Sequence, residues 1–438
     1  MNVLAGKLAV SLSLLLLLAF VNRPNVLDRL SSSQFFWLSW AILALIRITA
    51  FILIFVVIGL AAQSDVVVYY REAKSALSGA LIYRDFPSSY GPLFTYLEAG
   101  AVFLWDSPKS LVLLAIIVEL GSFPLWLRIA DRAFSDRIVR KSTLLYVFSP
   151  VPFFVVGVSG QNQCFGSAFL AMCICLLFQD RNALAGFVAG VSIPGVKFLT
   201  LLFAPVLWAF SHRRISFAAA FMVAPVIVYG WLLIADVDIL VPLYLQLNDR
   251  SPGNLPFLFS LIGLETKTIS QGRLWDAFLV ISLAGVFIFH FVRSKLRKHS
   301  CLIYFVTLIG LTFMICSKKS YANYLVFFYF PFCILVANLG FSWKSTAMFS
   351  AINLAASLEP SLYFRWFRNV PVSNASLALP LGVSVSPIVG MVSFIVCELV
   401  LMSCYLWYFW KAWIQTSTST ANIRTFGKND ILVRNAGC

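Results

Sequence analysis

Charged residues and histidines are scarce in this sequence. Asp, Glu, Lys and Arg together make up 12% of the 438 residues, about half the share found in an ordinary globular domain. The three histidines, His212, His290 and His299, fall at or near apolar-run ends that we place on the cytoplasmic side. The composition therefore leaves no room for a soluble domain. Because no histidine is expected at the opposite, outer face, histidine catalysis there is excluded.

Several catalytic motifs are also missing. The sequence has no Gly-x-Ser-x-Gly elbow, no phosphate-binding loop and no Cys-x-x-Cys pair, so serine hydrolases, nucleotide hydrolases and thiol oxidoreductases lack their parts. The nine cysteines are scattered, mostly inside apolar runs, and form neither a disulfide framework nor a metal-binding pattern. The sequence requires no cofactor, and it leaves the need for a divalent metal open.

Apolar residues, in contrast, make up 60% of the chain. Because a membrane span needs about 20 mainly apolar residues, the sequence predicts an all-α, polytopic transmembrane bundle of about 11–13 spans. The formal charge of +15 then reflects Lys and Arg retained in cytoplasmic loops rather than a nucleic-acid partner. We expect one transmembrane catalytic domain, 1–413, followed by a basic cytoplasmic tail, 414–438, on the lipid surface.

Basic clusters between the apolar runs orient the chain, because Lys and Arg are retained on the cytoplasmic side. These clusters are Arg23 with Arg29, 128–141, Arg213 with Arg214, and 293–298. The spans that alternate without breaking this rule are 44–62, 110–130, 143–158, 164–179, 183–196, 198–210, 215–234, 274–292, 301–316, 323–340, 345–358 and 386–411.

Three short apolar runs need separate treatment. The run 93–105 is too short to cross, and crossing would also place the cluster 128–141 outside. The run 8–21 lacks a convincing cleavage site, so we expect it to be retained as an interfacial helix or as part of a hairpin with 35–46. The short spans on either side of 195–197 indicate a break in the helix that lines a cavity.

A polar segment, 64–94, follows the first predicted span. Apolar residues recur in it at offsets of three and four from Val66 to Ala80, which predicts a helix lying on the bilayer surface. Asp65 stands where the span ends and this helix begins. We therefore expect its carboxylate at headgroup depth, where it could also cap the helix. The first extracytoplasmic loop covers 63–109.

With this topology, six polar segments reach the outer face of the membrane. Any polytopic protein has outer loops, but their convergence favours a single site. The segments are 63–90, 159–163, 195–197, 248–254, 317–323 and 359–368.

Carboxylates beside cations are the chemistry available at that face. A carboxylate that accepts a hydroxyl proton, opposite cations that stabilise a departing phosphate, is sufficient to move a sugar from a phosphate to an alcohol. Asp65 is the candidate base. Lys197 is the strongest candidate cation for the phosphate, because it lies between two apolar runs on the predicted outer side, against the positive-inside trend. Other candidates for the phosphate or the sugar are Lys318, Lys319, Arg365, Tyr69, Tyr83 and Tyr90.

Simpler roles compete for several of these residues. Asp65 could be only a helix cap, and Lys318 with Lys319 could bind lipid headgroups. Arg365, with Arg368, could belong to a solvated loop.

The order of the motifs resembles the GT-C membrane glycosyltransferases. The first loop carries D-x-x-x-Y-Y from Asp65, then G-A-L-I-Y-R-D-F and Y-G-P-L-F. These are followed by S-G-Q-N-Q, which contains Gln161, and by a Gly- and Pro-rich run, 185–205, which contains Lys197. This order is similar to the polyprenyl-phosphate-mannose-dependent mannosyltransferases of the GT87 branch, which includes the DUF2029 proteins. The resemblance covers about residues 44–340.

The resemblance implies an inverting transferase that moves a hexose, with mannose first, from a polyprenyl-phosphate-sugar to a lipid or glycan acceptor. It implies a bacterial plasma membrane and an extracytoplasmic site. Carried over by position, Asp65 is the general base, Lys197 a donor-phosphate or structural residue, and Gln161 a polar contact. Glu72 and Asp85 are both possible second acids.

Two alternatives remain open from the residues. Glu119 and Glu398 are ionisable groups inside apolar runs, which would suit a transporter or flippase of lipid-linked sugars. A glycan polymerase or ligase would keep the enzyme class but change the reaction.

Overall fold

The computed structural model describes residues 3–21, 30–247, 251–262, 269–293, 299–340, 342–367 and 387–418. These residues form helices joined by short loops, without a β-strand among them. The expectation of an all-α bundle is confirmed. In chain order the elements are α1 (Val3–Val21), α2 (Ser32–Phe51), η1 (Ile52–Val57), α3 (Val66–Leu77), α4 (Pro92–Leu104), α5 (Pro108–Ala133), α6 (Asp136–Val147), α7 (Pro150–Pro152), η2 (Phe153–Val158), α8 (Gln163–Leu177), α9 (Asn182–Gly195), η3 (Phe198–Phe203), α10 (Ala204–Phe210), α11 (Arg214–Ile234), α12 (Val241–Leu247), α13 (Leu255–Leu261), α14 (Ile269–Arg293), α15 (His299–Cys316), η4 (Ala322–Phe328), α16 (Tyr329–Asn338), α17 (Trp343–Leu362), η5 (Tyr363–Phe367) and α18 (Pro387–Thr418).

The chain is an integral, multi-pass membrane protein. Within the described residues, seven helices are long and apolar enough to cross a membrane. A bent pair, α6 with 150–158, turns by 42°; if this pair counts as one span, the described residues contain up to eight spans. The predicted number of spans was larger because it counted short apolar helices as crossings. The described residues include five shorter apolar helices of 10–17 residues, namely 92–104, 163–177, 182–195, 198–210 and 322–338, and all of these except 92–104 were counted as spans.

The beginning of the chain differs from the prediction. The first apolar run is a 19-residue helix, α1, which meets the length and hydropathy requirement for a span and packs on α17. The run 35–46, proposed as its hairpin partner, lies inside a continuous apolar stretch, Ser32–Val57. The first long span after α1 therefore covers 32–57 instead of 44–62, because the central apolar peak alone does not reveal where a helix starts.

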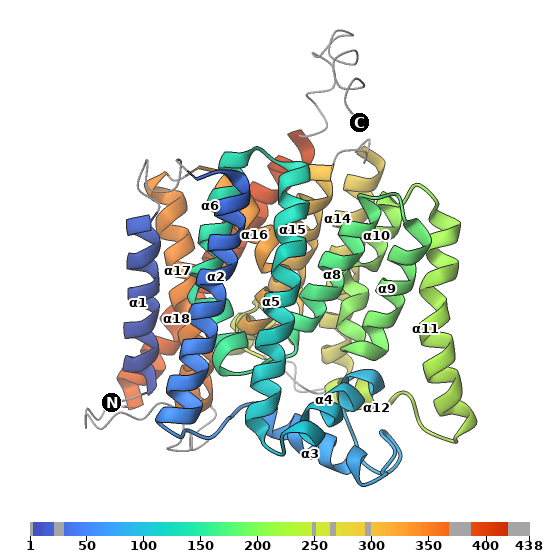
Figure 1. The fold of residues 1–438 in the computed structure, drawn as a ribbon. Coiled ribbons are helices and arrows are strands. Elements are labelled where there is room, and N and C mark those ends of the chain that lie inside the picture. Colours follow the sequence, from blue (N-terminus) through green and yellow to red (C-terminus); the bar gives the residue numbers. More distant parts are fainter. Residues whose placement is uncertain are drawn as a thin grey trace.

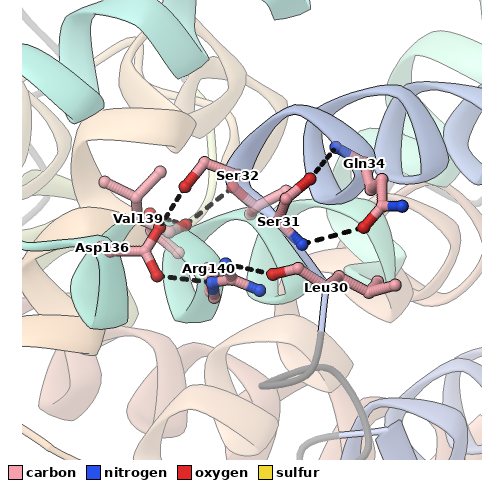
Figure 2. Close-up of polar contacts among 9 residues, drawn as sticks. Leu30, Ser31, Ser32, Gln34, Asp136, Val139 and Arg140 are labelled. Atoms are coloured by element: carbon pink, nitrogen blue, oxygen red, sulfur yellow. Dashed lines mark hydrogen bonds and ion pairs between the residues drawn. The ribbon is translucent and has the colours of Figure 1, made fainter.

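Sequence signals for helix initiation do appear at the start of α2, as Figure 2 shows. The Ser31 hydroxyl accepts from the Gln34 amide, and the Gln34 side chain accepts from the Ser31 amide, which completes a capping box. Arg140 of α6 donates to the Leu30 carbonyl (2.8 Å) and to Asp136 (2.6 Å). The start of α2 is thereby fixed to α6.

Short helices α3, α4 and α12 gather at one end of the bundle (Figure 1), which we call the loop end. The predicted surface helix is α3, and it packs directly against α4. The run 93–105 is α4, which lies at the loop end as expected of a segment that does not cross. From there α5 extends for 26 residues to Ala133 at the opposite end, where the cluster 128–141 lies.

A buried ion pair joins α2 and α5 inside the bundle. Arg47 and Glu119 form two hydrogen bonds, Nε–Oε2 of 2.8 Å and Nη2–Oε1 of 3.0 Å, and their side chains are 0% and 1% exposed. The Tyr146 hydroxyl of α6 donates to the same carboxylate at 3.0 Å. Glu119 is therefore held in a three-helix contact rather than placed in an open ion path.

We expect Glu119→Leu to destabilise the protein by about 3–5 kcal/mol, because it leaves the Arg47 charge buried without its partner. The double variant Arg47→Met/Glu119→Leu is expected to recover most of that loss, since it buries no unpaired charge. Denaturant unfolding of the purified protein in detergent measures both. A single variant as stable as the wild type would show that the pair does not hold these helices together.

Candidate functional site

Asp65 occupies the turn that leads into α3. Its backbone is already helical (φ −61°, ψ −22°), and it follows Ser64, which has a left-handed φ of 71°. A capping side chain works from an extended backbone, and the Asp65 carboxylate makes no capping hydrogen bond. The predicted capping role is therefore wrong. The carboxylate interacts instead with Lys197, Lys319 and Gln161.

Gln161 connects distant segments beside Asp65. Its side-chain amide donates to the Ser64 hydroxyl (Nε2–Oγ 2.9 Å), and its side-chain oxygen accepts from Asn323 (Nδ2–Oε1 3.3 Å). Gln161 itself is 2% exposed and lies in the turn between η2 and α8. This one side chain therefore fixes the start of the first loop against both α8 and η4.

Two glycines of the sequence motifs allow the first loop to approach the bundle. Gly160 has φ 55°, and an added Cβ would lie 2.9 Å from Cγ2 of Val66. Gly91 is closer still, because an added Cβ would lie 2.3 Å from the carbonyl oxygen of Pro194. The Gly91 amide donates to the Val196 carbonyl at 2.8 Å. The loop thus docks onto the end of α9.

Lys197 lies where α9 gives way to η3, with an extended backbone (φ −173°, ψ 165°). The predicted helix break at this point is confirmed. The side chain is 6% exposed, and its ammonium sits 4.2 Å from the ring centre of Tyr324 and 5.6 Å from that of Phe327. Cation–π contacts of this kind are worth about 0.5–2 kcal/mol, so aromatic faces stabilise this buried cation.

Lys197 also lines a cavity of about 270 Å³. Lys318 and Lys319 line the same cavity, and Lys318 is paired with Asp276 of α14 (Nζ–Oδ2 2.7 Å). Three of the four predicted cations are therefore brought together, from two segments more than 100 residues apart. The remaining lining residues are Asp276 itself, Leu199, Leu243, Gln246, Phe313, Ser317 and Tyr324.

The electrostatics of Asp65 and Lys197 depend on each other. Burial raises the pKa of the Asp65 carboxyl, whereas Lys197, Lys319 and a hydrogen bond from Gln161 act to lower it. Burial lowers the pKa of Lys197 to about 7, while Asp65 acts to raise it. Burial thus disfavours the charged form of each group, and the opposite charge of the other group stabilises it. Such shifted groups at a cavity are typical of a reactive site.

The two candidates for a second acid are in very different places. Glu72 is 7% exposed, accepts from the Ser88 hydroxyl at 2.7 Å and interacts with Asp65; burial raises its pKa to about 7. Asp85 is an exposed carboxylate paired with Arg84 at 2.9 Å, and that hydrogen bond lowers its pKa to about 2. The structure therefore places Glu72, and not Asp85, beside Asp65. Glu98 is 2% exposed and interacts with Glu72, and the sequence did not single it out.

The three predicted tyrosines pack rather than line the cavity. Tyr69 is 1% exposed and contacts Tyr90 edge-on, with ring centres 4.8 Å apart. Tyr83 is buried in a separate apolar cluster, and its hydroxyl donates to the Tyr90 carbonyl. Tyr90 is half-buried and interacts with both Asp65 and Tyr324. Tyr69 also interacts with Asp65, and the partner Tyr324 of Tyr90 lines the cavity.

Arg365 is not brought to the cavity. It lies exposed in η5, stacked on Trp366 at 5.4 Å, while its predicted companion Arg368 lies outside the described residues. Sequence reasoning also missed Asp276 and Asn323. An acidic residue at the loop end of a span was the available signal for Asp276; Asn323 carried none, because its role depends on the contact with Gln161.

The described residues contain no group of three or more His, Cys, Asp or Glu side chains placed to hold a metal ion.

Comparisons with known proteins support the fold. No protein-family model and no curated protein matches the sequence. Among solved structures, the chain is similar to ArnT from Cupriavidus metallidurans, crystallised with undecaprenyl phosphate: 12% identity, TM-score 0.52, covering 89% of this chain and 77% of that one. The apo oligosaccharyltransferase of Archaeoglobus fulgidus is also similar, with 12% identity and a TM-score of 0.38, covering 87% of this chain and 56% of that one. The likeness to ArnT shows a GT-C fold.

We expect Gly91→Ala to loosen the first loop, because the new methyl group would meet the Pro194 carbonyl. The variant should unfold at lower temperature and should exchange the amide hydrogens of 64–94 faster than the wild type. Gly100→Ala is the matched control: it lies inside α4 with no atom within 4 Å of the added Cβ, so it is expected to be neutral or to stabilise by up to about 1 kcal/mol. Equal exchange in the two variants would rule out the docking contact.

Proposed function

We propose that this protein is an inverting glycosyltransferase that moves a sugar from a polyprenyl-phosphate donor to a hydroxyl acceptor. One observation carries the proposal. Asp65, on the first loop, interacts with Lys197 and Lys319, and both lysines line a cavity formed by distant segments. The likeness to ArnT supports a membrane fold in which such a site would reach a lipid-linked donor.

The chemistry assigned to the site is a single displacement. Asp65 accepts the proton of the acceptor hydroxyl as that oxygen forms a bond to the anomeric carbon. The bond between the anomeric carbon and the phosphate oxygen breaks, and the lipid phosphate leaves with the bonding electrons. Lys197, Lys318 and Lys319 stabilise the charge that develops on this phosphate. Displacement from the opposite side inverts the anomeric configuration.

Three finer parts of the proposal rest on the sequence resemblance. These are a hexose, with mannose first, as the transferred sugar; a lipid or glycan as the acceptor; and an extracytoplasmic site in a bacterial plasma membrane. The distribution of charge agrees with the last, since the basic segment 128–141 lies at the end opposite the loop end.

A transporter of lipid-linked sugars has weaker support. Glu119, one of the two intramembrane acids that favoured it, is neutralised by Arg47 at 2.8 Å. Flux of a lipid-linked sugar without a covalent product would favour that transporter. Transfer only from a diphosphate-linked oligosaccharide would favour a polymerase or ligase.

Replacing the base provides the first test. Membranes that carry wild-type protein are expected to transfer label from radioactive polyprenyl-phosphate-mannose, or from another polyprenyl-phosphate sugar supplied alongside. Asp65→Asn should reduce the rate by about 10²- to 10⁴-fold, because the amide cannot accept the proton. The control is Asp106→Asn, which removes an exposed carboxylate of the same loop. Near-normal transfer by Asp65→Asn would remove Asp65 from this role.

The charge of Lys197 provides a test by pH. The ammonium is charged below its pKa of about 7, so the wild type is expected to bind undecaprenyl phosphate less tightly as the pH rises through 7. An arginine stays protonated over this range, and Lys197→Arg should lose this part of the pH dependence. Calorimetric titrations between about pH 6 and pH 9 measure both proteins. The same profile for both would show that Lys197 does not supply the charge.

A further inference from the structure

A buried carboxylate of α18 holds a loop that contacts the segment carrying two of the cavity lysines. Oε2 of Glu398 accepts a hydrogen bond from the Gly253 amide at 2.6 Å. Glu398 is 1% exposed and lies within an apolar span, where a polar contact is scarce and a carboxylate is expensive to bury. Gly253 is suited to this position because its φ is 83°, a conformation that other residues adopt only under strain.

The loop that Glu398 holds consists of Ser251, Pro252, Gly253 and Asn254, all of them buried. The Asn254 side chain makes this loop a rigid unit. Its amide donates to the carbonyl oxygens of Ser251 (2.8 Å) and Pro252 (3.2 Å), and its oxygen accepts from the Phe257 amide (2.9 Å), which caps α13. A displacement of Gly253 would therefore move the whole loop.

The far side of this loop contacts the segment that carries the cavity lysines. The Ser251 amide donates to the Lys318 carbonyl at 3.0 Å. Gly253 also packs near Ser320, whose carbonyl oxygen would lie 3.4 Å from an added Cβ. Lys318 and Lys319 both line the cavity. An unbroken series of contacts thus runs from Glu398, through the 251–254 loop, to the two lysines.

We propose that Glu398 is a positioning residue for the phosphate-binding cavity: by holding Gly253 it fixes the 251–254 loop, and through Ser251 it fixes Lys318 and Lys319. This inference rests on the proposed function only in taking the cavity as a phosphate site. It gives Glu398 a task that needs a hydrogen-bond acceptor and not a path for protons.

The variants are chosen to separate two roles of Glu398, that of a hydrogen-bond acceptor and that of a group that carries protons. Glu398→Gln keeps a side-chain oxygen that can accept from the Gly253 amide. Glu398→Leu removes the acceptor and leaves that amide buried without a partner, which frees the loop. A proton path would be blocked by both substitutions, whereas the positioning role is rescued by glutamine.

The experiment measures binding of undecaprenyl phosphate to the purified, full-length protein in detergent. We expect Glu398→Leu to weaken binding at least about tenfold, equivalent to about 1.4 kcal/mol, and Glu398→Gln to stay within about twofold of the wild type. Hydrogen exchange should rise at the amides of 251–254 and 317–320 in the leucine variant alone. Unchanged exchange and binding in Glu398→Leu would overturn the inference, as would equal loss of binding in both variants.

The matched control separates positioning from general stability. Tyr408→Phe removes another buried hydrogen bond of α18, to the Ser345 carbonyl at 3.3 Å, that does not touch the loop. It should lower the unfolding temperature without changing the affinity. If Glu398→Leu does not fold, Gly253→Ala tests the same contact by strain. If Glu398→Leu does fold, the effects of the two substitutions should not add in the double variant. Loss of affinity in Tyr408→Phe as large as in Glu398→Leu would overturn the inference.

Failure of this inference is distinguishable from failure of the proposed function. A wild-type protein that does not bind undecaprenyl phosphate would overturn the phosphate site itself, and with it this role for Glu398. A wild-type protein that binds, beside a Glu398→Leu variant that binds equally well, would overturn the positioning role alone.

Discussion

The hydrogen bond between the Gly91 amide and the Val196 carbonyl, 2.8 Å long, is the contact on which the site depends. A helix that breaks among apolar segments exposes backbone groups, and such groups must find partners within the protein. Here the partner comes from the first loop, so the break that presents Lys197 and the loop that presents Asp65 are stabilised by the same contact. Only glycine fits at residue 91, because Pro194 leaves no space for a side chain.

Ionisable groups in this bundle are used in two ways. Arg47 and Glu119 satisfy each other at 2.8 and 3.0 Å, and the pair fixes α2 against α5. Asp65 and Lys197 interact with each other, and two aromatic rings lie 4.2 and 5.6 Å from the lysine ammonium. The first arrangement fixes two helices, whereas the second borders a cavity of about 270 Å³. Because α2 continues through η1 toward the first loop, the Arg47–Glu119 pair also holds the span that leads to Asp65.

Much of the fold could be predicted from the sequence, because apolar runs and basic clusters carry it directly. The surface helix after Asp65, the break at Lys197 and the shared position of Lys318 and Lys319 were all accessible in this way. Other features depend on contacts between distant segments that no local pattern records. The capping role of Asp65 failed because Ser64 turns the chain first, and Arg365 is separate because η5 packs on α17 and α18. Tyr83 looked available for stacking, but α9 and α11 cover it.

The short apolar helices have a consequence for the surrounding bilayer. With 10–17 residues they reach about 15–26 Å, less than the roughly 30 Å of a hydrocarbon core. Gln161, Lys197 and Asn323 each lie at or beside an end of one of these short helices. The helices therefore stop short of a full crossing at the candidate site. Helices 182–195 and 198–210, which meet at Lys197, expose apolar side chains such as Leu184 and Leu201, and lipids beside such short segments are expected to thin or bend to match them. On the proposed function, such thinning would shorten the distance that a lipid phosphate has to descend to reach Lys197.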